Sequence, residues 1–218
     1  MARAWLPWLA GAAILLDIIL TLLVAPEAAL QARLTQRIFY YHVPSAWVAY
    51  LAFAVTAAAG FQHLRTRSPR ADALALASAE VGTVFSLIAM ATGLVWSRQA
   101  FLHYDAIRDP KVISLAVVIL AYLAYFALRN AIDDPARRRR VAAVYGILAL
   151  IGVPLSYLAS QASVHPDFTR PDESLDPRLG VYLLYSTLAF TILYAALADA
   201  RHHLALVEQR LEESPSTT

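Results

Sequence analysis

The sequence predicts an all-α integral membrane protein with six transmembrane helices and both termini in the cytoplasm. Of its 218 residues, 59% are hydrophobic and 16% are charged, whereas a soluble domain of this length exposes far more charge. The apolar residues gather in six long stretches, and the breaks between them are polar or rich in proline. Arginines concentrate in alternate breaks, which sets the predicted orientation.

Each stretch is close to the length of about 20 residues that an α-helix needs to cross a bilayer. We predict one six-helix transmembrane domain over residues 1–203, then a cytoplasmic helical extension and a disordered tail over residues 204–218. The extension is predicted because charged residues alternate there with leucine and valine, and the polar last residues indicate disorder. The predicted spans cover roughly residues 5–24, 46–63, 73–95, 112–129, 141–160 and 179–200.

Arginine-rich breaks alternate with breaks in which acidic residues balance the basic ones. Residues 65–70 contain three arginines, residues 137–140 are four arginines in a row, and the tail opens Arg201-His202-His203. The positive-inside rule places these segments in the cytoplasm and the other three breaks on the extracytoplasmic face. The run at 137–140 also suits docking of a partner or an anionic lipid, but a topology determinant is the simpler interpretation.

Several kinds of chemistry are excluded by what the sequence lacks. It has no cysteine, so disulfides, thiolate metal sites, iron–sulfur clusters and covalent haem attachment are all ruled out. It has no Gly-rich phosphate loop, nucleophile elbow or H-E-x-x-H pair. We therefore predict that the chain is not an enzyme, and any ligand to a metal must come from histidine, methionine or oxygen.

Three histidines fall in the three extracytoplasmic breaks: His42, His103 and His165. His42 and His165 each lie next to a proline at a predicted helix end, where the fixed proline backbone can hold a neighbouring ring in place. A single interfacial histidine is usually an ordinary polar residue. Two of them on different loops of one membrane face make a pair of metal ligands an equally good interpretation.

Aromatic and basic side chains surround these histidines in the sequence. An aromatic belt at the headgroup level explains many such residues in any membrane protein. It explains less well why several aromatic rings occupy one short outer loop. Such a loop would suit a flat apolar macrocycle, and nearby basic side chains could pair with the carboxylates of that macrocycle. The aromatic candidates are Trp47, Trp96, Phe101 and Tyr104, and the basic candidates are Arg98, Arg108 and Lys111.

Two acidic residues, Asp17 and Glu80, lie inside predicted spans. Carboxylates within a membrane are costly, so each is a functional candidate. For Glu80, a bond to a neighbouring helix near the cytoplasmic end is the simpler interpretation. Asp17 lies deeper and has no evident partner in the sequence.

Along nearly its whole length the chain resembles the haem exporter protein C family, membrane proteins that handle haem during cytochrome c maturation. The strongest match is Phe39-Tyr40-Tyr41-His42-Val43-Pro44-Ser45-Ala46-Trp47, which is similar to the family pattern F-Y-x-H-V-P-x-A-W. Further matches are Ala79-Glu80-Val81-Gly82, Thr92-Gly93-Leu94-Val95-Trp96 and Gly152-Val153-Pro154.

The resemblance implies that the protein binds haem b on the extracytoplasmic face of the inner membrane and delivers it to a membrane-anchored haem chaperone. It implies an ABC-type ATPase and a second membrane subunit as partners, besides membrane lipid, and no nucleic acid. The family's two axial haem ligands correspond to His42 and His165. The apolar wall would be formed by Trp47, Trp96, Phe101 and Tyr104.

The outer loop after Trp96 departs from the family pattern W-G-T-W-W-x-W-D-P-R-L-T-S. Phe101 and Tyr104 replace tryptophans there, and most other aromatic residues of the pattern are missing. Ring stacking tolerates these replacements with less contact area, so the change bears on the affinity and geometry of the haem site. His103 lies inside this loop and offers an alternative ligand.

Three alternative functions stay open at the level of sequence. A membrane redox subunit would need ligating histidines near the middle of the membrane, and none of the six histidines is predicted there. A transporter passing haem through its own helices would need more polar or broken segments within the spans. A structural subunit that no longer binds haem would differ from the favoured function in lacking a haem spectrum.

Overall fold

The structure is a computed structural model that describes residues 4–25, 35–100, 105, 107–159 and 177–213. Over these residues the chain forms seven α-helices and one short 3₁₀ helix, η1, with no strand. In chain order they are α1 (Leu6–Leu23), η1 (Thr35–Ile38), α2 (Phe39–Thr66), α3 (Pro69–Ala100), α4 (Pro110–Asn130), α5 (Pro135–Ala149), α6 (Gly152–Leu158) and α7 (Pro177–Glu213).

Six segments are long and apolar enough to cross a membrane, with α5 and α6 together making the fifth. The predicted fold class, an all-α membrane protein with six spanning helices, is confirmed. Many large apolar side chains on the outer surfaces of these helices are exposed, as a lipid-facing surface requires. The placement of the two termini in the cytoplasm remains a prediction.

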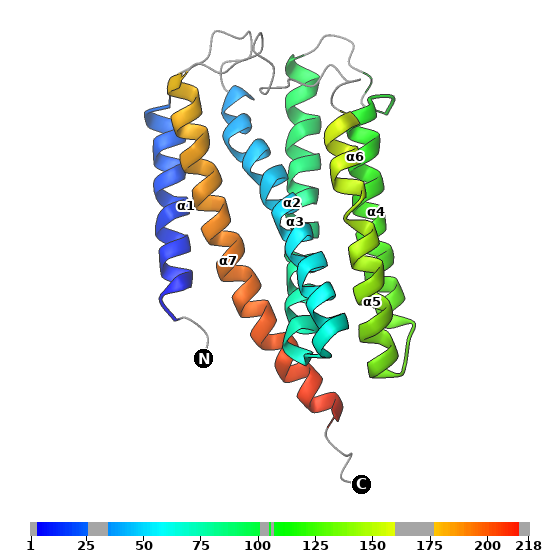
Figure 1. The fold of residues 1–218 in the computed structure, drawn as a ribbon. Coiled ribbons are helices and arrows are strands. Elements are labelled where there is room, and N and C mark those ends of the chain that lie inside the picture. Colours follow the sequence, from blue (N-terminus) through cyan, green and yellow to red (C-terminus); the bar gives the residue numbers. More distant parts are fainter. Residues whose placement is uncertain (1–3, 26–34, 101–104, 106, 160–176, 214–218) are drawn as a thin grey trace.

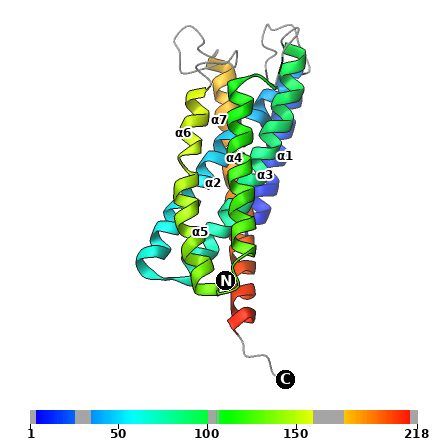
Figure 2. The ribbon, with the colours of Figure 1, turned by 90° about the vertical axis from the view of Figure 1, so that its right-hand side faces the viewer.

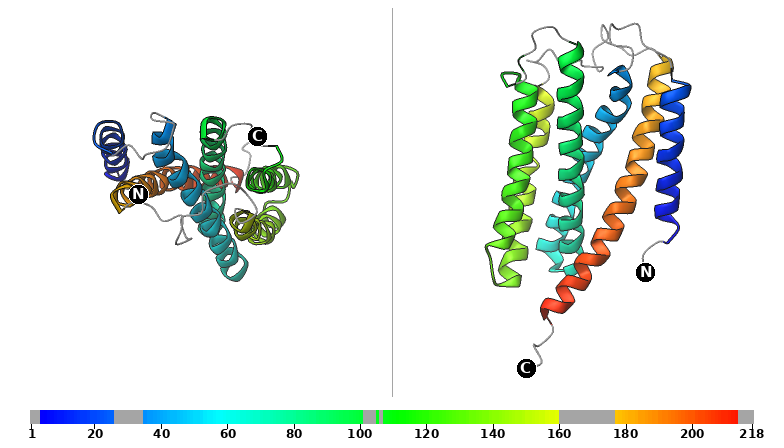
Figure 3. Two further views of the ribbon diagram at one scale, coloured as in Figure 1. Left: turned by 90° about the horizontal axis from the view of Figure 1, so that it is seen from above. Right: turned by 180° about the vertical axis from the view of Figure 1, so that it is seen from behind.

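The helices run side by side as an elongated bundle (Figures 1 and 2). The hairpin of α2 and α3 lies in the middle, with α1 and α7 on one side and α4, α5 and α6 on the other (Figure 3). We call the end where α1 begins and α7 ends the terminal end. The opposite end, where α2 and α7 begin, is called the loop end.

The close approach of α2 and α3 depends on small residues. A Cβ added at Gly82 on α3 would lie 2.8 Å from the Cβ of Ala52 on α2 and 2.9 Å from a ring carbon of Phe53. Ala49 and Ala79 are fully buried as well. In a bilayer, helix association relies on such close packing because lipid chains are as apolar as leucine side chains.

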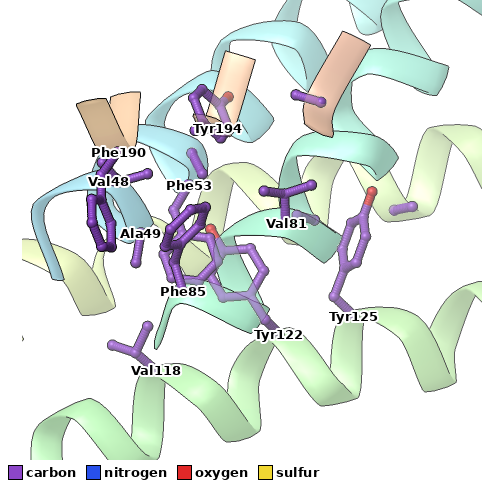
Figure 4. Packing of buried hydrophobic residues seen from close by; sticks show 14 residues of the cluster. Val48, Ala49, Phe53, Val81, Phe85, Val118, Tyr122, Tyr125, Phe190 and Tyr194 are labelled. Carbon is purple, nitrogen blue, oxygen red and sulfur yellow. The ribbon is translucent and has the colours of Figure 1, made fainter. Parts of the chain in front are cut away.

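The largest buried cluster joins α2, α3, α4, α5 and α7 (Figure 4). At its centre the rings of Phe53 and Tyr122 stack with centroids 3.7 Å apart and planes within 12°. Tyr125 and Phe190 extend the cluster toward α5 and α7. These contacts fix the positions of the helices that carry the candidate site.

Two helices reach further toward the loop end than the sequence predicts. α2 begins at Phe39 and not near residue 46, and α3 continues to Ala100, past residue 95. Proline is typical of a helix start, but Pro44 lies inside α2, where it removes one backbone hydrogen bond. Neighbouring side chains anchor this first part of α2, since Tyr40 is 1% exposed.

The fifth spanning segment is broken where one continuous helix was predicted. α5 ends at Ala149 and α6 begins at Gly152. Pro154 has no N–H to donate to the carbonyl of Leu150, so that carbonyl instead accepts from the N–H of Val153 at 3.0 Å. The tighter turn offsets α6 from α5.

Both intramembrane acids have partners on α7. Arg201 donates to Glu80 at 3.0 Å, which confirms the predicted bond between Glu80 and a neighbouring helix. Asp17 is 1% exposed, and its Oδ1 accepts a hydrogen bond of 2.6 Å from the hydroxyl of Ser186. A residue 169 positions away therefore supplies the partner that the sequence did not reveal.

Candidate functional site

The imidazole of His42 lies near the loop end and points from α2 to α3. Its Nδ1 is 2.9 Å from the carbonyl oxygen of Ala89 and 3.2 Å from the hydroxyl of Thr92. The Thr92 hydroxyl itself donates to the carbonyl of Ile88 at 2.7 Å, which leaves its oxygen to accept from the ring. Both contacts lie on consecutive turns of α3 and orient the imidazole.

These contacts determine the tautomer of His42. A carbonyl oxygen can only accept, so Nδ1 must carry the proton and donate to Ala89. In the neutral ring the lone pair then resides on Nε2. Metal-ligating histidines in proteins commonly use this arrangement, with one ring nitrogen donating to a backbone carbonyl and the other facing the metal. The chemistry of the residues present therefore fits an axial ligand to haem iron.

Gly93 makes room for this ring. A Cβ at position 93 would lie 2.7 Å from Cε1 of His42 and 3.2 Å from its Nδ1. No larger residue fits there while the ring keeps its two hydrogen bonds to α3. Gly93 thus belongs to the site although it offers no functional group.

Trp96 and Trp47 hold different positions relative to His42. Trp96 follows Thr92 and Gly93 by one turn of α3, so all three lie on the same face of that helix, and Trp96 is partly buried. Trp47 lies five residues after His42, about 140° around α2. With 54% of its surface exposed, Trp47 faces away from the ring of His42.

The three basic candidates are separated. Lys111 donates to the hydroxyl of Tyr50 at 3.2 Å and to the carbonyl of Ser156 at 3.0 Å, so it ties α4 to α2 and α6. Arg108 pairs with Asp105 at 3.4 Å on the surface. Arg98 is exposed on the last turns of α3, just after Trp96.

The remaining candidates lie outside the described residues. These are the second predicted ligand His165, the alternative ligand His103, and the aromatic residues Phe101 and Tyr104. The pairing of His42 with His165 and the roles of the other residues therefore stay predictions.

Sequence reasoning missed the groups that orient His42. Thr92 and Gly93 were noticed only as part of a motif, and Ala89 was not singled out. The backbone carbonyl of Ala89 leaves no mark in the sequence, whereas the glycine was a usable signal. A Gly near the end of an apolar helix indicates a close approach by another group.

The fold and the site define a polytopic helical membrane protein that holds an oriented imidazole near one end of its helical bundle. The family model described as Heme exporter protein C matches residues 1–216, and the chain belongs to this family. The resemblance to the haem exporter protein C family, which the motif around His42 indicated, is therefore confirmed.

Individual relatives agree along most of the chain. Heme exporter protein C of Bradyrhizobium diazoefficiens is 33% identical over 216 residues, which cover 94% of this chain and 78% of the relative. Heme exporter protein C of Escherichia coli K12 is 32% identical over 181 residues, covering 80% of this chain and 72% of the relative. The corresponding protein of Rhodobacter capsulatus is 28% identical over 219 residues, covering 95% and 88%.

Proposed function

We propose that this protein binds haem b at the loop end of its bundle and delivers it to a membrane-anchored haem chaperone during cytochrome c maturation. Family membership supports haem handling in cytochrome c maturation as the general role. The observation that carries the specific proposal is the bond from Nδ1 of His42 to the carbonyl of Ala89, which directs the lone pair to Nε2.

In this proposal His42 and His165 ligate the haem iron through neutral imidazoles. His42 is held ready by α3, so binding requires little reorientation of its ring. Trp96, one turn beyond Gly93, supplies an aromatic surface on the same side as His42. Phe101 and Tyr104 would complete the wall. Trp47 faces away from the ring of His42, so it is the least well placed of the predicted wall residues.

Charged groups at the loop end would pair with the haem carboxylates. Arg98 is exposed on the last turns of α3, and Arg108 is exposed and pairs with the surface carboxylate of Asp105. Lys111 would have to release Tyr50 and Ser156 before it could do so. Arg98 and Arg108 are therefore better placed for this role than Lys111.

The wider assembly follows the family. We place the protein in the inner membrane with the haem site on the extracytoplasmic face, because the arginine-rich segments mark the terminal end as cytoplasmic. The proposed partners are an ABC-type ATPase and a second membrane subunit. This chain binds and presents haem, and makes or breaks no bond in it.

The test is an optical spectrum of the purified protein, oxidised and reduced, with haem added. Wild-type protein should show the Soret band of a bis-histidine low-spin haem, and His42→Ala and His165→Ala should each lose or shift it. His203→Ala is the matched control because His203 lies at the terminal end, where its Nδ1 donates to Asp199. A Soret band unchanged in both ligand variants would exclude the ligand assignment. No band in the wild type would favour a structural subunit.

A further inference from the structure

Two neighbouring cavities flank the start of α5 at the terminal end, far from the haem site. The first has a volume of about 420 Å³ and lies between the end of α2, the start of α3 and the first turns of α5. The second, about 300 Å³, lies along α5 and the end of α4. Arg140 and Val144 line both, so the two cavities adjoin.

The first cavity is basic. Its lining includes Arg67, Arg139 and Arg140, and no carboxylate is among the described residues that line it. The contrast with a third cavity nearby is informative, because there the arginines meet acids: Arg129 binds Asp72, and Arg201 binds Glu80. The first cavity therefore presents a net positive charge to a ligand, whereas the charges that line the third cavity balance.

The second cavity is lined mainly by apolar side chains, apart from Arg140, which also lines the first cavity. Leu128, Val141 and Leu148 line it together with Val144, and these side chains come from the membrane-spanning parts of α4 and α5. The pair of cavities thus offers cations at the membrane surface and an apolar groove that runs from them toward the membrane interior. This arrangement is complementary to an anionic phospholipid, which has a negatively charged headgroup and apolar acyl chains.

Arg67 adds an independent observation. It caps α2 in the left-handed conformation, with φ 53° and ψ 24°, and its N–H donates to the carbonyl of His63 at 2.7 Å. Glycine is the favoured residue at such a position, because a Cβ is strained there. A strained non-glycine residue is a pointer to function, and here its side chain lines the basic cavity.

We propose that these two cavities form a binding site for one anionic phospholipid of the leaflet at the terminal end. Arg67 and Arg140 would hold the phosphate, and an acyl chain would lie against Val144 and Leu148. Basic pockets between transmembrane helices at the cytoplasmic surface are known to suit such headgroups. Because α5 would hold the lipid against α2, the lipid would brace the bundle at this end.

The experiment is a lipid titration of delipidated, detergent-purified protein, followed by native mass spectrometry. Wild-type protein should bind one dioleoyl phosphatidylglycerol more tightly than dioleoyl phosphatidylcholine. The double variant Arg67→Gln/Arg140→Gln should weaken phosphatidylglycerol binding about 30-fold, since each arginine near the surface contributes on the order of 1 kcal/mol. Its haem Soret band should not change, because the cavities lie at the opposite end from His42.

The matched control is Arg65→Gln/Arg137→Gln. It removes the same charge from the same two segments, at exposed positions that line neither cavity. Equal loss of lipid binding in both double variants would overturn the site, since net charge alone would then explain it. Glycerol phosphate that competes as well as intact lipid would also overturn the proposal, because a free anion would then be the ligand.

Discussion

Gly93 has no Cβ, and this absence is what lets the ring of His42 lie close to α3. The ring of His42 occupies the space that a Cβ at position 93 would need. Two hydrogen bonds to α3 hold the ring there, so the ring and an added methyl group cannot both be accommodated. The identity of residue 93 therefore affects the orientation of the proposed ligand, although glycine supplies no ligand group itself.

Gly93→Ala should displace the ring of His42 and weaken haem binding about tenfold, the effect of losing roughly 1.4 kcal/mol by overpacking. A haem titration monitored at the Soret band measures this. Gly180→Ala is the control, because a Cβ at position 180 meets nothing within 4 Å. An unchanged affinity in Gly93→Ala would show that the orientation of His42 seen here is not the one that binds haem.

At the scale of elements, the helices are fastened to one another at the terminal end by ion pairs. Arg129 on α4 donates to both oxygens of Asp72 on α3, at 2.7 Å and 3.0 Å, and Gln209 on α7 donates to the same carboxylate at 2.9 Å. The carboxylate and the guanidinium are both buried. Three helices thus meet at one buried charge pair.

Asp72→Asn should destabilise the bundle by about 3–5 kcal/mol, because it leaves a buried guanidinium without its counter-charge. Thermal unfolding in detergent, followed by tryptophan fluorescence, measures the change. Asp105→Asn is the matched control, since its pair with Arg108 is exposed and should contribute no more than about 1 kcal/mol. Similar melting temperatures for the two variants would mean that the buried pair does not fasten the helices.

At the scale of the whole molecule, the bundle has two ends of different chemistry. The loop end carries His42 and Trp96, and the terminal end carries the buried Asp72–Arg129 pair and the basic cavity. α7 runs past the other helices at the terminal end (Figure 1). The proposed haem site and the proposed lipid site therefore lie at opposite ends and share no residues.

The predicted orientation belongs to this scale, because it depends on charge summed over whole segments. A green fluorescent protein fused after Thr218 should fluoresce, and an alkaline phosphatase fused after Asp105 should be active. The reverse pattern would place the haem site on the cytoplasmic face and contradict the proposed delivery. Replacing Arg137–Arg140 with glutamine should reduce the fraction of molecules in the predicted orientation, whereas replacing the exposed Arg108 should not.

The fold class and most of the span positions could be predicted from the sequence, because apolar length is a property of consecutive residues. The helix ends were less predictable. The sequence predicts a helix start near residue 46, just after Pro44, whereas tertiary contacts of Tyr40 keep α2 intact before that proline. The sequence also predicts one continuous span over residues 141–160, whereas the helix breaks after Ala149, close to Pro154.

By itself the sequence determined that the chain is a six-span membrane protein of the haem exporter family with His42 as a candidate ligand. Only the tertiary structure decided which nitrogen of His42 carries the proton, why residue 93 is glycine, and which arginines pair with acids. The physical reason is distance along the chain. His42 meets Ala89 across 47 residues and Asp72 meets Arg129 across 57, and such contacts exist only once the helices have packed.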